Sequence, residues 1–298
     1  MIDYHNDTTL FRESLLYTEA ETGFNARLIE KDYFCTVILA TLQELIEECS
    51  QSKDVAPLYF KGGTCLSKIH ARFYRMSEDL DFTISLDASS ARSQRSRLIT
   101  PFKKMIAKLA ERNPVFTVSQ ELIGHNNSTQ YVAAILYSSL LTGQPETIKI
   151  EISLRELVLD QTQTVFPVDT LLLNPLRRQR AVLPINIMAL SCMETYAEKF
   201  RAALTRREPA IRDFYDIDYG SRERLFDVND VRLLHLIGQK LAVVGNEVME
   251  LAPPRKKELR QQVEPHLAPV QRQRDLESFD LDLAFEIVAH VAKKVSPQ

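Results

Sequence analysis

Two patterns of apolar residues divide the chain and constrain its fold more than any other feature. In the first part, four segments place apolar residues at every second position, as half-buried strands do: "LDFTISL", "VFTVSQEL", "YVAAILYSSL" and "TIKIEISL". Residues 25–49 and the segment "RSRLITPFKKMIAKLAER" instead repeat apolar residues at steps of three and four, as helices do. From "LPINIMALSCMETYAEKFRAALTR" onward the helical repeat dominates, with long segments near 229–250 and 279–294. The sequence therefore predicts a mixed α/β half, residues 1–157, followed by and packed against a mainly helical half, residues 158–298.

The composition restricts the class of protein. With 298 residues, of which 45% are hydrophobic and 26% charged, the chain can bury a sizeable core without disulfide bonds. Its formal net charge of -3 does not by itself indicate a nucleic-acid-binding protein. The four cysteines show no metal-ligand spacing, which is typical of reduced core thiols. The sequence has no apolar signal segment and no long apolar window, so we expect a cytoplasmic protein without membrane association.

A pair of glycines, Gly62 and Gly63, follows the short expected strand "LYF" in a chain with only eight glycines. A strand that ends in Gly-Gly and turns into a helix near Thr64 can present backbone N–H groups and the positive end of the helix to a phosphate. Glycine lets such a ligand approach closely, and the Thr64 hydroxyl would add a further group. The Gly-Lys-Ser/Thr ending of a Walker A loop is absent, which excludes the common ATPase loop. A structural turn explains the glycines equally well.

Two aspartates, Asp79 and Asp81, occupy alternate positions and so lie on one face of an expected strand, with Leu80, Phe82 and Ile84 on its core face. Carboxylates placed in this way repel unless a cation lies between them, and hard divalent cations such as Mg²⁺ take oxygen ligands. Two metal ions are a recurrent device for displacement at phosphorus. A solvated strand face is the alternative for the two aspartates alone. The order of phosphate turn, helix and carboxylate strand favours a nucleotidyltransferase.

A third carboxylate can come from the segment "TIKIEIS". There, Ile148, Ile150 and Ile152 are expected to face the core, which places Lys149 and Glu151 together on the opposite face. Glu151 is thus a candidate third metal ligand, or a general base toward an incoming hydroxyl. A solvated pair with Lys149 is equally compatible with the pattern.

A lysine in the expected helix 190–204 is turned away from its acidic neighbours. We expect Glu194, Glu198 and Arg201 to share a solvated face, whereas Lys199 lies about 140° round the helix from Glu194. A lysine turned toward the body of the protein needs an anion to offset its desolvation, and a triphosphate would serve. The alternative is a lysine that reaches the surface along its aliphatic stem.

Two further aspartates, Asp213 and Asp216, lie three residues apart in "RDFYDIDY" and can share a helix face. Asp213 is the stronger candidate for a role in the site. Salt bridges to Arg212 or Lys199 are the structural explanation of both.

Taken together, these pieces resemble the nucleotidyltransferase toxins of type IV toxin–antitoxin and abortive-infection systems, the AbiE group of the DNA-polymerase-β-like superfamily. The matching segments occur in the family's order: "IEKDYF" (29–34), "FKGGTCLSK" (60–68), "RMSEDLDF" (75–82), "IEIS" (150–153), "AEKFRAAL" (197–204) and "RDFYDIDY" (212–219). The resemblance implies a nucleotidyltransferase core with a mixed β-sheet, and a helical C-terminal part that completes the active site.

The same resemblance implies an activity and partners. It implies Mg²⁺-dependent transfer of a nucleoside monophosphate from an NTP, in some relatives to the 3′ end of tRNA, which blocks translation, together with a separately encoded antitoxin. By position, Gly63 and Thr64 would hold the triphosphate and the two aspartates of "SEDLDF" the metal ions, while Lys199 and Asp213 would form the second side of the site. Glu151 is not part of a distinctive motif, so the resemblance does not fix its role.

Ser77 is a further candidate on the nucleotide-binding side, because it lies two residues before Asp79. We hypothesise that a covalent or binding block at Ser77 silences the site. Unaltered activity of a Ser77→Glu variant would count against this hypothesis.

A strip of basic residues between Arg177 and Arg212 suits the phosphates of a tRNA acceptor stem, with an affinity that falls steeply as salt rises. Eight basic side chains against three acidic ones give this segment a net charge of +5. Solvated helix faces explain the strip equally well. Two other functions stay open: transfer to a protein or small-molecule acceptor, and non-catalytic partner binding on the same scaffold. The sequence does not fix the NTP, the antitoxin or the oligomeric state.

Overall fold

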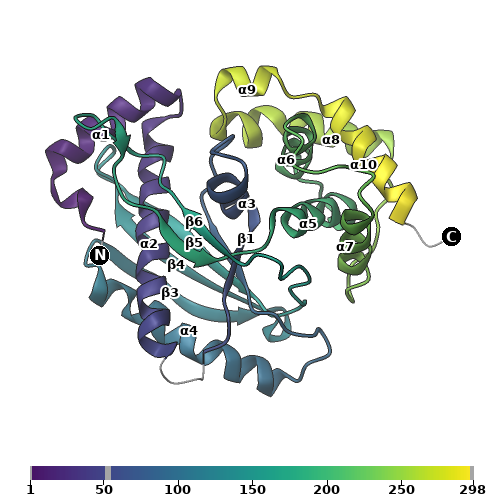
Figure 1. The fold of residues 1–298 in the computed structure, drawn as a ribbon, viewed down its shortest axis with the longest axis horizontal. Coiled ribbons are helices and arrows are strands. Elements are labelled where there is room, and N and C mark those ends of the chain that lie inside the picture. The colour runs from purple at the N-terminus through teal and green to yellow at the C-terminus, as the bar shows by residue number, and fades with distance from the viewer. Residues whose placement is uncertain (1, 51–54, 296–298) are drawn as a thin grey trace. The chain divides into compact units, whose positions relative to one another are not determined.

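The computed structural model describes residues 2–50 and 55–295 and divides the chain into two compact units (Figure 1). The first unit contains the residues up to Val158 together with Gln163–Ala189, and the second contains Leu159–Thr162 and the residues from Leu190 onward. The chain therefore crosses between the units three times, and the first crossing lies next to the boundary expected at residue 157.

The first unit is built on a five-stranded sheet with the strand order β1-β2-β5-β4-β3. Strands β2 and β5 run parallel, while the other neighbours are antiparallel, so the sheet is mixed as expected. Alternation sets the core: the apolar residues of β2 and β5 are buried on one face. The strands are β1 (Tyr59–Lys61), β2 (Leu80–Thr83), β3 (Phe116–His125), β4 (Gln130–Ser138) and β5 (Pro145–Ser153).

Helix α2 (Ala26–Ser50) packs on this sheet and confirms the helix expected over residues 25–49. It is apolar around most of its circumference, which is typical of a helix covered on all sides. Its Phe34 ring lies 4.2 Å from Tyr137 of β4 and, edge-on, 5.8 Å from Phe116 of β3, measured between ring centroids. The other helical elements of the sheet region are η1 (Tyr4–Asn6), α1 (Thr8–Thr22), α3 (Gly62–Cys65), the π-helical turn η2 (Leu66–His70), α4 (Arg92–Arg112) and η3 (Asn126–Ser128).

Two short strand pairs complete the first unit. Strand β6 (Val165–Val168) pairs antiparallel with β9 (Ile185–Met188), and β7 (Leu173–Asn174) pairs with β8 (Gln179–Arg180). The segment "LPINIM" was expected to open the helical part, and this expectation is wrong. Its apolar residues alternate, Ile187 is buried, and Ala189 bridges to Phe60 of β1, so tertiary pairing selects the strand.

The second unit is helical, as expected. Its elements are α5 (Cys192–Thr205), α6 (Ile211–Arg222), α7 (Val231–Leu241), α8 (Pro253–Gln261), η4 (Val263–Leu267), η5 (Ala268–Val270), α9 (Gln273–Glu277) and α10 (Leu281–Val295). Helix α7 ends well before residue 250, because two valines are followed by Gly245 at a φ of +92°, a conformation that glycine adopts without strain. Among the described residues, no helix is long and apolar enough to cross a membrane.

Candidate functional site

The connection from β1 to β2 brings the glycine turn onto the aspartate strand. The two strands are antiparallel with Lys61 opposite Asp81, and α3 begins at Gly62 directly after β1. Across the connection, the Thr64 hydroxyl donates a hydrogen bond to the main-chain carbonyl oxygen of Asp79. The expected order of strand, glycine turn and helix is therefore present. The Thr64 hydroxyl proton is already used, and Thr64 is buried, so only its backbone N–H is suited to a phosphate.

The two glycines leave room for charged side chains of the chain itself. A Cβ added at Gly62 would lie 2.2 Å from Asp81 Oδ2, and the residue has a φ of +77°. A Cβ at Gly63 would lie 2.7 Å from an Arg75 guanidinium nitrogen and 3.0 Å from Ser77 Oγ. Both distances to the charged groups are too short for real Cβ atoms. The structure therefore requires Gly62, whose backbone lies against the Asp81 carboxylate, while a side chain at Gly63 would displace the Arg75 guanidinium.

A row of charged residues crosses three neighbouring strands beside this turn. Lys61 of β1 lies opposite Asp81 of β2, which in turn lies opposite Glu151 of β5. Directly opposed residues on adjacent strands point to the same face, so the two carboxylates face each other across strands that are about 4.8 Å apart. Asp79 precedes β2 and is exposed. The structure thus brings Asp81 and Glu151 together from segments distant in sequence.

The donor chemistry of this face fits a hard cation. Carboxylate oxygens are the ligands that Mg²⁺ takes in proteins, and Mg²⁺ is usually held by one or two carboxylates together with substrate phosphates. Within residues 2–50 and 55–295, no three His, Cys, Asp or Glu side chains gather closely enough to hold a metal ion. The trio expected from the sequence is therefore not assembled as an all-protein cluster, whereas the pair Asp81 and Glu151 is in register.

Lys61 is a residue that sequence reasoning missed as a site candidate. Its side chain is buried, and its Nζ atom lies 3.4 Å from Oε1 of Glu156, which is also buried. Its position at the end of a strand, immediately before the glycine pair in "FKGG", was the available signal. Lys61 is therefore a buried cation beside the glycine turn, and its charge is paired with Glu156.

Lys199 and Asp213 lie together in the second unit. Lys199 Nζ is 3.0 Å from Asp213 Oδ1 and 2.7 Å from Asp216 Oδ2. Both aspartates are buried, and the Lys199 side chain is only 12% exposed. The lysine is thus turned into the protein, and its anions are these two carboxylates. Arg206 Nε adds a contact of 3.3 Å to Asp213 Oδ2.

The expectation that α5 carries a solvated acidic face is wrong. Glu194 and Glu198 are buried, and they lie 2.7 and 3.4 Å from the Nζ atom of Lys240, a buried residue of α7. Glu194 also accepts hydrogen bonds from the backbone N–H groups of Leu159 and Asp160. Helix α7 covers this face of α5, and the lysine offsets the buried charges. The spacing of polar and apolar residues along α5 does not reveal that α7 packs over this face.

The basic strip expected from Arg177 to Arg212 is divided between the two units. Arg177 and Arg178 are exposed at the turn between β7 and β8 in the first unit. Arg180, next to them, donates to the Leu171 carbonyl oxygen at 2.8 Å. From Lys199 onward the strip belongs to the second unit, where Arg212 Nε donates to the His266 carbonyl oxygen at 2.9 Å.

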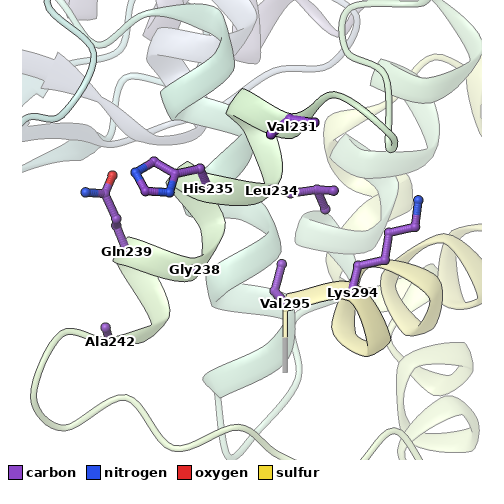
Figure 2. A pocket seen from close by; sticks show the side chains of 8 residues that line it. All are labelled: Val231, Leu234, His235, Gly238, Gln239, Ala242, Lys294 and Val295. Atoms are coloured by element: carbon purple, nitrogen blue, oxygen red, sulfur yellow. The ribbon is translucent and has the colours of Figure 1, made fainter. Parts of the chain in front are cut away.

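The second unit also contains a pocket of about 490 Å³ between α7 and the end of α10 (Figure 2). Figure 2 shows Val231 and Leu234 on one side of α7, and His235 and Gln239 on the other. No carboxylate lines the pocket, and neither does any site residue expected from the sequence. This pocket is therefore not the expected nucleotide site.

Comparisons with known proteins complete the description of the site. A family model described as nucleotidyl transferase AbiEii toxin of a type IV toxin–antitoxin system matches residues 44–287. Among solved structures, the JHP933 protein of Helicobacter pylori is similar with 14% identity and a TM-score of 0.46, covering 89% of this chain and 92% of that one. MenT4, a nucleotidyltransferase toxin of Mycobacterium tuberculosis, is similar with 15% identity and a TM-score of 0.45, with the same coverage. The comparison with curated proteins finds no match.

Proposed function

Because the chain belongs to the AbiEii family of nucleotidyltransferase toxins of type IV toxin–antitoxin systems, we propose that it transfers a nucleoside monophosphate from an NTP to an RNA acceptor. The proposed acceptor is the 3′ end of tRNA, whose modification would block translation. NTPs and tRNA are cytoplasmic, so the proposal includes a cytoplasmic location. The observation that carries the proposal is the row of Lys61, Asp81 and Glu151 beside the glycine turn.

In this proposal Asp81 and Glu151 hold Mg²⁺, and Asp79, the residue directly before β2, is a further candidate ligand. When bound, the ion would neutralise charge on the triphosphate and lower the pKa of the attacking hydroxyl. The backbone N–H groups of Gly62, Gly63 and Thr64 are directed at the phosphates. Positioning and charge compensation by these groups supply most of the catalysis expected for such transfer.

The proposal gives Lys199 and Asp213 a role in binding the phosphates, as the family resemblance implies. In the structure the charge of Lys199 is offset by Asp213 and Asp216, so this role requires Lys199 to exchange a carboxylate contact for a phosphate. Ser77 is kept as a candidate control point, because its hydroxyl lies against Gly63 at the turn.

The direct test is incubation of purified protein with total tRNA, Mg²⁺ and each α-labelled NTP in turn. Replacing Asp81 by Asn or Glu151 by Gln should lower labelling of tRNA by about 100-fold or more, because several kcal/mol of charge stabilisation are lost. Asp87→Asn is the matched control, since Asp87 is exposed in the loop that follows β2 and lies outside the site. Labelling that survives both site variants would overturn the proposed roles.

Two further measurements distinguish transfer to RNA from the alternatives, which are another acceptor and a non-catalytic function. If the acceptor is RNA, Arg177→Glu with Arg178→Glu should weaken labelling and reduce its dependence on salt. If labelling is unchanged and appears in a protein or a small molecule of the lysate, the acceptor lies there. Toxicity in cells that persists with Asp79→Asn and Asp81→Asn would instead support a non-catalytic, partner-binding protein.

A further inference from the structure

Two consecutive residues of α2 contact the two ends of the connection between the glycine turn and the aspartate strand. Lys31 Nζ lies 2.8 Å from Oε2 of Glu78, the residue immediately before Asp79. Cys35, one turn further along α2, directs its thiol toward the Glu78 carbonyl oxygen at 3.9 Å. Helix α2 therefore contacts the chain at the point where it enters the aspartate strand.

Asp32 contacts the other end of the connection. Its Oδ1 atom lies 2.6 Å from Nζ of Lys68, and both side chains are almost fully buried. Lys68 belongs to η2, which continues α3 directly from the glycine pair. The same lysine donates to Thr36 Oγ1 of α2 at 2.8 Å. The helical segment behind the glycine turn is thus held to α2 by a charge pair and a hydrogen bond.

Hydrogen bonds within the connection also join its two halves. Ser67 Oγ donates to the Arg75 carbonyl oxygen at 2.5 Å, and the Thr64 hydroxyl bonds the Asp79 carbonyl oxygen. Strand pairing anchors the two flanking strands, β2 to β5 and Phe60 of β1 to Ala189. The contacts from Lys31 and Asp32 anchor the parts between them, Glu78 before the aspartate strand and the helical segment behind the glycine turn, to α2.

Stabilisation of the fold alone does not explain why these ion pairs are present. Removing two charges from water costs several kcal/mol, and well-packed apolar residues often replace a buried ion pair without loss of stability. What an ion pair with a single favourable arrangement does supply is one defined geometry, and a displacement of about 1 Å at a reacting centre can cost about 100-fold in rate.

We propose that Lys31 and Asp32 of the segment "IEKDYF" are positioning residues that set the glycine turn and the carboxylates of Asp79 and Asp81 in one register. This inference rests on the proposed nucleotidyl transfer at that site. Neither residue touches the reacting groups in it, so the effect of both is transmitted through Glu78 and Lys68.

The test uses the pair Lys31–Glu78, because it can be reversed. Lys31→Glu and Glu78→Lys should each lower kcat by about 10- to 100-fold with little change in KM for the NTP, since binding groups are kept while alignment is lost. The reversed pair, carrying both changes, should restore kcat to within about threefold of the unmodified protein. If the pair had a purely structural role, the variants would instead lose kcat only in proportion to their loss of melting temperature.

Arg27→Met is the matched control. Arg27 lies one turn earlier on α2, and its ion pair is with Glu146 of β5 at 2.6 Å. This variant should keep kcat within about twofold, because the ion pair that it removes does not include a residue of the connection. Three results would each overturn the proposal. The single variants could keep full kcat, the reversed pair could fail to restore kcat, or Arg27→Met could lose as much kcat as Lys31→Glu.

Amide hydrogen exchange keeps the inference testable if no transfer is observed at all. An inactive unmodified protein would refute the proposed function, whereas exchange over residues 62–81 reports on positioning without substrate. The Lys31→Glu variant should exchange faster there than Arg27→Met, and the reversed pair should restore protection. Unchanged exchange in Lys31→Glu would refute the positioning role by itself.

Discussion

Replacing Gly62 by alanine gives the sharpest test of the candidate site. The substitution destabilises the protein in two separable ways, through the left-handed backbone conformation and through contact with Asp81. The residue has a φ of +77°, and an alanine in this left-handed conformation costs about 1–2 kcal/mol. The new Cβ would also lie 2.2 Å from Asp81 Oδ2, 2.9 Å from its Cβ and 3.0 Å from its Cγ. Rotation of the carboxylate alone does not relieve all three contacts. Overpacking of this kind adds about 1–3 kcal/mol.

Gly143→Ala isolates the conformational cost. Gly143 lies in the same unit at a φ of +69°, but nothing lies within 4 Å of its added Cβ. The chain has no tryptophan, so thermal unfolding is followed by far-UV circular dichroism. Gly62→Ala should melt below Gly143→Ala by about 2–4 °C for each kcal/mol of overpacking. Displacement of Asp81 should also lower nucleotide transfer by about 100-fold, while Gly143→Ala keeps it.

The outcome that would refute this reasoning is specific. If Gly62→Ala and Gly143→Ala melt together and both retain transfer, the contact between the turn and Asp81 does not exist in solution. A lower melting temperature with full activity would keep the contact but remove Asp81 from the reaction.

Further predictions concern the charge pairs and the thiols. Lys240→Met should lower the free energy of unfolding by about 3–5 kcal/mol, because Glu194 and Glu198 would stay buried without their cation; a urea titration showing less than about 1 kcal/mol would contradict this. Lys199→Met should likewise destabilise the protein by about 3 kcal/mol, and Lys199→Arg by less than half of that, since arginine keeps the charge beside Asp213 and Asp216. The hydrogen bond from Arg27 lowers the pKa of Glu146, so this pair stabilises the fold above the ordinary carboxyl pKa and is lost as the pH falls through the lowered value. Glu146→Gln should therefore cost up to about 1 kcal/mol at pH 7 and progressively less as the pH falls below the ordinary carboxyl pKa, and a cost that does not change with pH would refute the pairing. Burial raises the pKa of Cys35 to about 12, so alkylation at pH 8 followed by mass spectrometry should find Cys35 unmodified in the folded protein.

Several elements could be predicted from the sequence because their signals are local. The alternation in "LDFTI" and "TIKIEIS" places their apolar residues in the core, and the structure buries them. The repeat in residues 25–49 gives α2 almost to the residue. The position of Lys199 on its helix indicates a lysine turned inward, which the structure confirms.

Other features could not be predicted because they depend on neighbours distant in sequence. The burial of Glu194 and Glu198 follows from the packing of α7, and β9 forms because β6 is available to pair with it. The reason for two glycines is likewise tertiary: Asp81 and Arg75 occupy the space that side chains at Gly62 and Gly63 would need.

By itself, the sequence determined the strands of the five-stranded sheet, the glycine turn, the paired aspartates and the inward lysine, since each depends on the order and period of nearby residues. Only the tertiary structure decided that Asp81 faces Glu151 and Lys61, because strand register joins segments that no local pattern connects. It also decided that α2 holds both ends of the connection between β1 and β2, since a salt bridge requires two charges close in space, whatever their separation along the chain.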